Sequence, residues 1–136
     1  MKNIFVDTNI LIDIVCNRPG CADALKLLSS SGNYCNIHVS TLTMANMAYI
    51  LRKSFKIDAL YDKLKLLSDC FMVDSLSSMS YYLALELRAK DFEDALQYFC
   101  AIENDCDCII TNNVKDFSYS KLPVMSAEEY IIGKSC

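Results

Sequence analysis

Residues 3–15 spell NIFVDTNILIDIV, a mostly apolar run that passes into a helical pattern through three polar residues. The run at 3–6 predicts a buried strand that ends at the polar triplet 7–9. From residue 10 onward the apolar side chains recur at helical spacing. A strand that leads directly into a helix is the repeating unit of α/β proteins, so this stretch predicts that class for the chain.

The rest of the chain repeats this alternation. Further strands are predicted at 37–39, 71–73, 108–110 and 123–125, and helices at 21–30, 41–54, 58–67, 77–87, 91–104 and from 126, with a turn at 31–33. Strands that alternate with amphipathic helices predict helical layers around a central, mostly parallel sheet. The chain has 136 residues and shows no repeat, linker or change of composition, so we expect residues 1–136 to form a single domain.

The composition is that of an ordered globular protein, with 53% hydrophobic and 22% charged residues. Thirteen Lys and Arg against seventeen Asp and Glu give a net charge of −4, which argues against a protein that coats nucleic acid with a basic surface. No apolar run is long enough to span a membrane, and the N-terminal residues lack the pattern of a signal peptide. We therefore expect a cytoplasmic protein with no membrane association, in which the eight cysteines are reduced.

Three polar clusters follow predicted strands or begin predicted helices. Asp7 ends the first strand, and Asn113 and Asp116 follow a later one. Asp91 and Asp94 lie three residues apart, on one face of a helix. Each cluster also has an ordinary structural interpretation, as a helix cap or a polar turn. Because ligands bind outside the carboxyl ends of the strands in a parallel sheet, the fold alone can bring Asp7 and Asn113 together.

These clusters supply the oxygen ligands that Mg²⁺ or Mn²⁺ prefers. One such ion, or a pair about 3.5–4 Å apart, activates water and stabilises the charge that develops on a phosphodiester. The sequence contains no glycine-rich phosphate-binding loop, which disfavours the use of a nucleoside triphosphate. The clusters therefore favour metal-dependent hydrolysis.

Other residues that can bind metals give weaker signals. His38 is the only histidine and lies in a strand-like run, which favours a partly buried, hydrogen-bonded ring over a metal ligand. Cys106 and Cys108 are separated by one residue, which is not the spacing of a zinc knuckle, and no second pair follows. The sequence thus gives little support to a metal site built from these side chains.

Taken in order, the motifs resemble those of the PIN-domain (PilT N-terminal) family of bacterial ribonucleases, which includes the toxins of VapBC-type toxin–antitoxin pairs. The resemblance extends from residue 5 to about residue 130. It rests on FVDTNIL at 5–11, STLTMAN at 40–46, DFEDALQ at 91–97, IITNN at 109–113 and the pair Asp116-Phe117.

This resemblance implies a three-layer α/β/α sandwich with a mostly parallel sheet of about four or five strands. It also implies a metal-dependent endoribonuclease, with Mg²⁺ or Mn²⁺ as cofactor, RNA as substrate, an antitoxin protein as partner, and a homodimer. Asp7 and Asp94 match the first and third acidic positions of the family, and the fourth falls on Asn113 or Asp116. We expect Asp7, Asp94 and Asp116 to bind the metal and orient water, with Asn113 assisting. The residues expected beside the metal or the substrate are Thr8, Asn9, Asn46 and Thr111.

The chain departs from the family pattern at Asn46, where many active members have a glutamate. The loss of one charge weakens the attraction for a divalent ion, and we expect Asp91, one helical turn before Asp94, to compensate as a further metal ligand. The alternative function is a PIN-fold module that binds RNA or protein and cleaves poorly or not at all.

A basic stretch lies apart from the acidic clusters. Its members are Arg52, Lys53, Lys56, Lys63 and Lys65. They are interpreted either as ordinary solvated helix faces or as a rim that follows the backbone of RNA.

Overall fold

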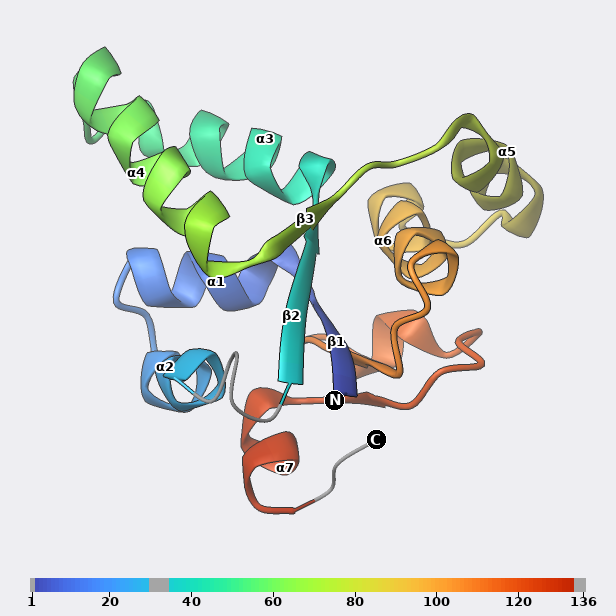
Figure 1. The fold of residues 1–136 in the computed structure, drawn as a ribbon. Coiled ribbons are helices and arrows are strands. Elements are labelled where there is room, and N and C mark those ends of the chain that lie inside the picture. Colours follow the sequence, from blue (N-terminus) through green and yellow to red (C-terminus); the bar gives the residue numbers. More distant parts are fainter. Residues whose placement is uncertain (1, 30–34, 134–136) are drawn as a thin grey trace.

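The computed structural model describes residues 2–29 and 35–133, so the turn predicted at 31–33 lies outside the described residues. Five parallel strands form one sheet in the order β3-β2-β1-β4-β5 (Figure 1). The strands are β1 (Lys2–Val6), β2 (Cys35–Ser40), β3 (Met72–Asp74), β4 (Cys108–Ile110) and β5 (Val124–Met125).

Helices cover both faces of the sheet. They are α1 (Thr8–Val15), α2 (Cys21–Ser29), α3 (Thr41–Leu51), α4 (Ile57–Cys70), α5 (Ser78–Leu87), α6 (Phe92–Glu103) and α7 (Ala127–Ile131), with a 3₁₀ helix η1 (Val114–Phe117). Helices α1 to α4 lie on one side of the sheet and α5 and α6 on the other (Figure 1). The predicted three-layer α/β/α sandwich is confirmed.

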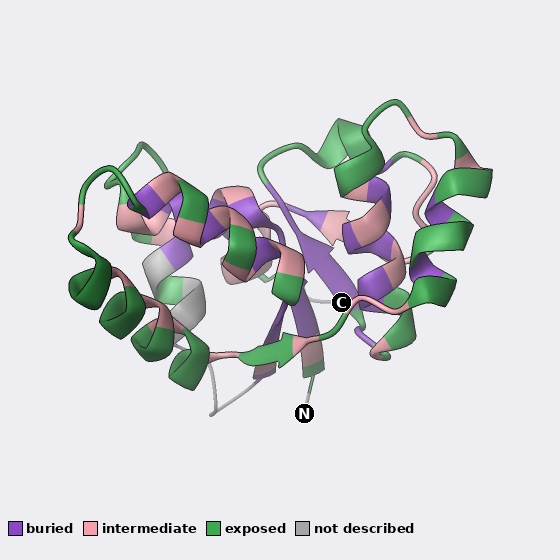
Figure 2. Cartoon of the chain, turned by 90° about the horizontal axis from the view of Figure 1, so that it is seen from above, coloured by how far each residue is buried: buried purple, intermediate pink, exposed green. Residues whose placement is uncertain are grey.

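Strand β1 is the centre of the molecule because it pairs with both β2 and β4. Successive side chains of a strand point to opposite faces, so Ile4 and Val6 enter one apolar core and Phe5 enters the other. All three are fully buried, and most of β1, β2 and β4 is coloured as buried, whereas the edge strand β3 is largely exposed (Figure 2). Burial of one such side chain stabilises the fold by about 1.5–3 kcal/mol.

Helix α6 packs differently from the sequence-based prediction. Helical spacing in the sequence predicts a core stripe of Phe92, Ala95, Leu96 and Phe99, yet the Phe92 ring is 41% exposed and contacts Tyr81 of α5 edge-on. Ala95 is buried as predicted, Leu96 and Phe99 are half-buried, and Tyr98 and Ala101 complete the buried face. The two alanines in this face allow the helix to approach the sheet closely.

Among the described residues, the thiols of Cys16, Cys21, Cys70, Cys100 and Cys106 are free. Cys108 is disulfide-bonded, so the expectation that all the thiols are reduced is wrong at this position. Within the part of the chain that the structure describes, no helix is long and apolar enough to cross a membrane.

Candidate active site

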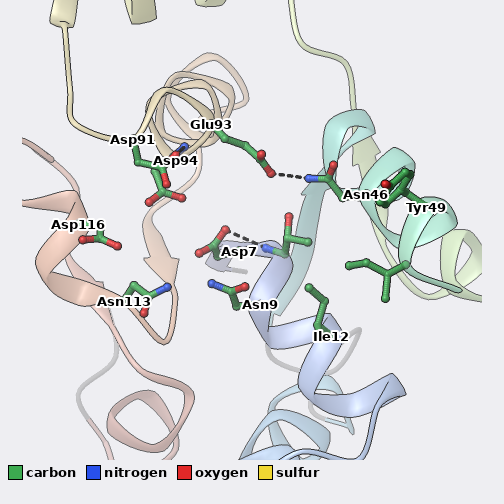
Figure 3. Close-up of a pocket in the computed structure, with 12 residues that line it drawn as sticks. Asp7, Asn9, Ile12, Asn46, Tyr49, Asp91, Glu93, Asp94, Asn113 and Asp116 are labelled. Atoms are coloured by element: carbon green, nitrogen blue, oxygen red, sulfur yellow. Dashed lines mark hydrogen bonds between the residues drawn. The ribbon is translucent and has the colours of Figure 1, made fainter.

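A pocket of about 290 Å³ opens at the carboxyl ends of the strands, where α1, α3, α6 and η1 begin or meet (Figure 3). Twelve residues line it: Asp7, Thr8, Asn9, Ile12, Asn46, Tyr49, Ile50, Asp91, Glu93, Asp94, Asn113 and Asp116. Eight of the nine residues singled out from the sequence are among them, and the ninth, Thr111, lies directly behind Asp7. The parallel topology thus gathers segments that are up to about a hundred residues apart in the chain.

Asp7 occupies the first position after β1 and is the N-cap of α1. Its Oδ1 accepts a hydrogen bond from the Thr8 amide at 2.9 Å, and its Oδ2 accepts one from the Thr111 hydroxyl at 2.8 Å. The residue is only 3% exposed. Burial raises the pKa of this carboxyl, the two hydrogen bonds oppose the rise, and the charges of Glu93 and Asp91 add to it. Asp7 is therefore both a helix cap and a rigidly held carboxylate in the pocket.

Asp94 lies in the first turn of α6, half-buried beside the pocket. Its pKa is raised to about 7, most of all by burial and then, in decreasing order of effect, by the neighbouring charges of Asp7, Asp91, Asp116 and Glu93. A carboxyl that remains half protonated near neutral pH shows how strongly this pocket opposes further negative charge. A bound cation would reverse that preference.

Asp91 is the N-cap of α6, and its Oδ1 accepts a hydrogen bond from the Asp94 amide at 3.0 Å. The alternative interpretation of this cluster, a solvated acidic first turn of the helix, did not include this capping role. The residue also lines the pocket. Its carboxylate lies beside that of Asp94 (Figure 3), as the three-residue spacing predicted.

Glu93 was missed by the sequence-based assignment. It extends from α6 across the mouth of the pocket and accepts a hydrogen bond from the Asn46 side-chain amide on α3 (Figure 3). Successive side chains of a helix point about 100° apart, so helical spacing predicts that Glu93 lies off the face shared by Asp91 and Asp94. This is why the sequence did not identify Glu93 as a pocket residue. Its long side chain nevertheless reaches the same space. The amide of Asn46, half-buried at the lining, thus stands next to a carboxylate supplied by another helix.

The loop after β4 forms the opposite wall. The buried hydroxyl of Thr111 donates to Asp7 and accepts from the Asn113 amide at 3.0 Å, so one side chain connects the ends of β1 and β4. Asn113 caps η1, and the Asp116 amide donates to the Asn113 carbonyl at 2.9 Å. These contacts direct Asn113 and Asp116 towards Asp7.

Beneath the pocket lies a buried network of four polar side chains. Gln97 of α6 donates to the hydroxyls of Thr8 (3.1 Å) and Thr43 (2.9 Å), and it accepts from the hydroxyl of Ser40 at 2.7 Å. The Thr8 and Thr43 hydroxyls bond each other at 2.8 Å. The network connects the starts of α1 and α3 with α6. No periodic pattern in the sequence indicates it, because its four residues lie on different elements.

The donor set fits a hard divalent cation. Five carboxylates line the pocket, and none of the described residues that line it is basic. Magnesium and manganese prefer such oxygen ligands, and a positive ion compensates for the repulsion that raises the pKa of Asp94.

Cationic and aromatic groups flank this acidic pocket. A neighbouring groove of about 540 Å³ shares Asp91 and Asp116 and adds Lys90, Lys115 and Tyr119. The Tyr119 hydroxyl is buried and has no hydrogen-bond partner among the described residues. Burial, followed by the charges of Asp94 and Asp91, raises the pKa of this hydroxyl, which therefore stays neutral.

On the other side, Tyr49 is 67% exposed, and the guanidinium of Arg52 lies 3.5 Å from the centre of its ring. Of the basic residues noted in the sequence, Arg52 therefore reaches the margin of the pocket. Lys63 lies over Phe55 at 5.2 Å, and Lys53, Lys56 and Lys65 are exposed around the α3–α4 hairpin.

Comparison with known proteins agrees with this architecture. The family model for the PIN domain matches residues 3–115. Ribonuclease VapC1 of Aquifex aeolicus (strain VF5) is 28% identical over 138 residues, which cover 95% of this chain and 93% of the relative. The crystal structure of VapBC2 from Rickettsia felis, bound to a DNA fragment from its promoter, aligns with a TM-score of 0.72 at 21% identity, over 90% of this chain and 96% of the other. VapBC-1 from nontypeable Haemophilus influenzae aligns with a TM-score of 0.71 at 21% identity, over 93% and 98%.

Proposed function

The chain belongs to the PIN domain family, and from this premise we propose that it is a divalent-metal-dependent endoribonuclease, a hydrolase that acts as the toxin of a toxin–antitoxin pair. The observation that carries the proposal is the pocket of five carboxylates at the carboxyl ends of the strands. The name of the bacterial relative, a ribonuclease, supports the choice of RNA as substrate.

We assign Asp7, Asp94 and Asp116 as ligands of Mg²⁺ or Mn²⁺, with Asp91 as a further ligand. When bound, the ion supplies charge stabilisation at a phosphodiester and activates water. The chain supplies rigidity: Asp7 is held through both oxygens, and the N-cap contact of Asp91 fixes the first turn of α6. Asn113 offers an uncharged amide opposite these carboxylates, and Thr8, Asn9 and Asn46 complete the wall.

The flanks of the pocket fit a single-stranded RNA. The exposed ring of Tyr49, with Arg52 stacked on it, offers a surface for a base. Lys90 and Lys115 in the adjoining groove are placed to contact phosphates. Protein and RNA are both acidic, so binding depends on these local cations and on the metal rather than on a basic surface.

The test is cleavage of a generic single-stranded RNA by the purified chain with Mn²⁺ or Mg²⁺, beside Asp7→Asn and Asp94→Asn. We expect cleavage by the unmodified chain, loss of at least about a hundredfold in both variants, and loss on addition of EDTA. Asp62→Asn, an exposed carboxylate on α4, is the matched control and should retain activity. Cleavage that persists in both pocket variants would contradict the assignment.

The second candidate is a PIN-fold module that binds RNA or protein without cutting, and Asn46 is the observation that favours it. Glu93, bonded to Asn46, restores a carboxylate at this wall and favours the enzyme. An unmodified chain that binds RNA but neither cleaves it nor retains Mn²⁺ would favour the binding module.

We also propose a homodimer and an antitoxin partner. Helix α5 exposes Met79, Tyr81, Tyr82 and Leu85, an apolar face that suits a second copy of the chain. The solved relatives whose titles name VapBC complexes support the partner. Light scattering of the purified chain should give twice the monomer mass, and co-expression with the adjacent upstream gene should relieve toxicity in cells.

A further inference from the structure

Three side chains that can bind metals meet far from the acidic pocket. His38 lies on β2, Asp74 ends β3, and Cys106 lies in the turn between α6 and β4. A nitrogen of His38, a carboxylate oxygen of Asp74 and the Cys106 sulfur all lie within 4.8 Å of one another. None of the three lines the acidic pocket. The cluster sits on the α5–α6 side of the sheet, since His38 is the register partner of Phe5 and Cys106 belongs to the same apolar core.

The histidine is already held in an orientation that suits a metal ligand. Its Nε2 lies 3.2 Å from the side-chain oxygen of Asn3, which also accepts a hydrogen bond from the Asn36 amide at 3.1 Å. Because this oxygen is an acceptor, Nε2 donates to it; the carboxylate that Nδ1 faces is an acceptor too, so that contact also holds a proton, which a metal ion would replace. The Nδ1 atom faces Asp74, with 2.7 Å between Nδ1 and Oδ2. A carbonyl oxygen that fixes one ring nitrogen while the other faces the metal is the usual support of a ligating histidine.

The sulfur atoms lie in surroundings that disfavour a bare thiolate. Cys106 is free and 5% exposed, and burial, followed by the charge of Asp74, raises its pKa to about 12. Cys100 of α6, also free and buried, adds to that rise because it lies close by, and its own pKa is raised to about 12 by burial and by Asp74. The Cys100 thiol makes two weak contacts: it donates to the Ser75 carbonyl at 3.8 Å and accepts from the Asn104 side-chain amide at 3.7 Å. Both thiols therefore remain protonated unless a cation replaces their protons.

We propose that His38, Asp74 and Cys106 bind one Zn²⁺ ion, and that Cys100, which lies outside this group of three, moves in as the fourth ligand. Tetrahedral zinc separates its ligand atoms by about 3.3–3.8 Å, given the usual Zn–N, Zn–O and Zn–S bond lengths. To reach this geometry, the distance between His38 Nδ1 and Asp74 Oδ2 increases from 2.7 Å. The largest separation between ligand atoms of the three residues, at most 4.8 Å, decreases by about 1 Å. Binding displaces the proton from each thiol and any proton on Nδ1, which pass to solvent.

A mixed set of nitrogen, oxygen and sulfur ligands selects zinc over magnesium or manganese, which suit the oxygen-only pocket. Four protein ligands leave no open position, so the role is structural: the ion connects β2, β3 and the turn before β4. The spacing of these residues in the sequence predicted no such site, because three separate segments supply the ligands. The proposal does not depend on the proposed nuclease activity.

The test is a titration of the purified, reduced full chain with Co²⁺, which takes the place of zinc and absorbs light. We expect a thiolate-to-cobalt charge-transfer band that saturates at one ion per chain and disappears when Zn²⁺ is added. The acidic pocket has no sulfur among its lining residues, so cobalt bound there gives no such band. Absence of the band from the unmodified chain overturns the proposal without any variant.

Variants locate the ligands. Cys106→Ser and His38→Gln should weaken Co²⁺ binding at least about tenfold, whereas Asp94→Asn and Cys70→Ser, which changes an exposed thiol, should leave it unchanged. Cys100→Ser should lower the intensity of the band about twofold, because one of two thiolates is lost. Full intensity in Cys100→Ser would remove Cys100 from the site, and a band that persists unchanged in Cys106→Ser would overturn the whole assignment.

Zinc should also raise the thermal midpoint of the unmodified chain and of Asp94→Asn, since a ligand that binds only the folded state stabilises it. Loss of this rise in His38→Gln places the effect at the proposed site. An equal rise in His38→Gln would contradict it.

Discussion

The contact between Glu93 and Asn46 determines how the missing family glutamate is interpreted. The amide replaces one carboxylate of the expected set, and the neighbouring helix supplies another at the same wall. If metal affinity depends on the negative charge at this wall and not on which helix carries it, Glu93 replaces the glutamate expected at position 46. This residue-scale hypothesis leads to a pair of substitutions with opposite effects.

Glu93→Gln should weaken Mn²⁺ binding roughly tenfold, which corresponds to about 1.4 kcal/mol, because the pocket loses one attracting charge. Asn46→Glu should strengthen binding and lower the stability of the metal-free protein, because two carboxylates then face each other. Isothermal titration calorimetry measures both affinities. Glu86→Gln, an exposed residue of α5, is the matched control. Unchanged affinity in both pocket variants would show that this wall does not contact the ion.

The raised pKa values of Asp94 and Asp7 predict an unusual dependence of stability on pH. In the metal-free protein the folded state keeps a proton on Asp94 up to about pH 7, whereas the unfolded chain loses it near 3.8. The folded state therefore binds more protons in that interval, and the free energy of unfolding falls as pH rises through it. Asp7 contributes in the same direction.

Thermal melts in EDTA between pH 4.5 and 7.5 measure this effect. Asp94→Asn should flatten the decline with rising pH. With saturating Mn²⁺ the decline should become a rise, since the ion binds the ionised carboxyls. A metal-free protein that becomes steadily more stable over this range would contradict the raised pKa values.

At the scale of elements, the site is assembled by the starts of helices rather than by the strands themselves. Three of these helices begin at a capping residue: Asp7 for α1, Ser40 for α3 and Asp91 for α6. The end of the preceding segment determines where the backbone of each capping residue lies. The network around Gln97 then sets the distances between these three helices.

Gln97→Leu should lower the free energy of unfolding by about 1–3 kcal/mol, because the buried hydroxyls of Thr8, Thr43 and Ser40 lose a partner they cannot replace with water. Cleavage should fall with it, since α1, α3 and α6 carry the carboxylates and their neighbours. Urea unfolding and the RNA assay measure the two effects. Thr41→Ala, an exposed change in the first turn of α3, should alter neither.

Local sequence patterns predicted the order of helices and strands well, but in α6 they did not predict which side chains are buried and which residues they contact. Helical spacing placed both Ala95 and Phe92 in the core stripe, and only Ala95 is buried. Phe92 lies at the start of α6 and contacts Tyr81 of α5, a neighbour that the spacing within one helix does not reveal. Glu93 and Gln97 were missed for a related reason: their partners, Asn46, Thr8, Thr43 and Ser40, lie on other elements.

At the scale of the molecule, two apolar cores share one strand. Ile4 and Val6 of β1 enter the core with α1 to α3, and Phe5 enters the core with α6 and η1. Both cores pack against β1, so loss of packing in either core exposes residues of the strand on which the other core depends. We therefore propose that residues 1–136 behave as one domain and unfold as one unit.

Chemical unfolding should give coincident transitions by far-ultraviolet circular dichroism and by tyrosine fluorescence, the latter usable because the chain has no tryptophan. Phe5→Leu, placed in the α6 core, should shift both transitions to lower denaturant by the same amount. Separate transitions by the two probes would indicate that the two cores unfold independently.

The sequence alone specified the alternation of strands and helices, the parallel sheet and the positions of Asp7, Asp94, Asn113 and Asp116 after strands or at helix starts. These depend on hydrophobic period and on residues that end strands, which are local properties of the chain. The partners of those residues were settled only in three dimensions: Glu93 against Asn46, Gln97 beneath the pocket, and His38 with Asp74 and Cys106. Each of these contacts joins residues that are distant in the sequence, and no periodic pattern relates their positions. Only the tertiary structure brings the residues together and shows what they can do chemically.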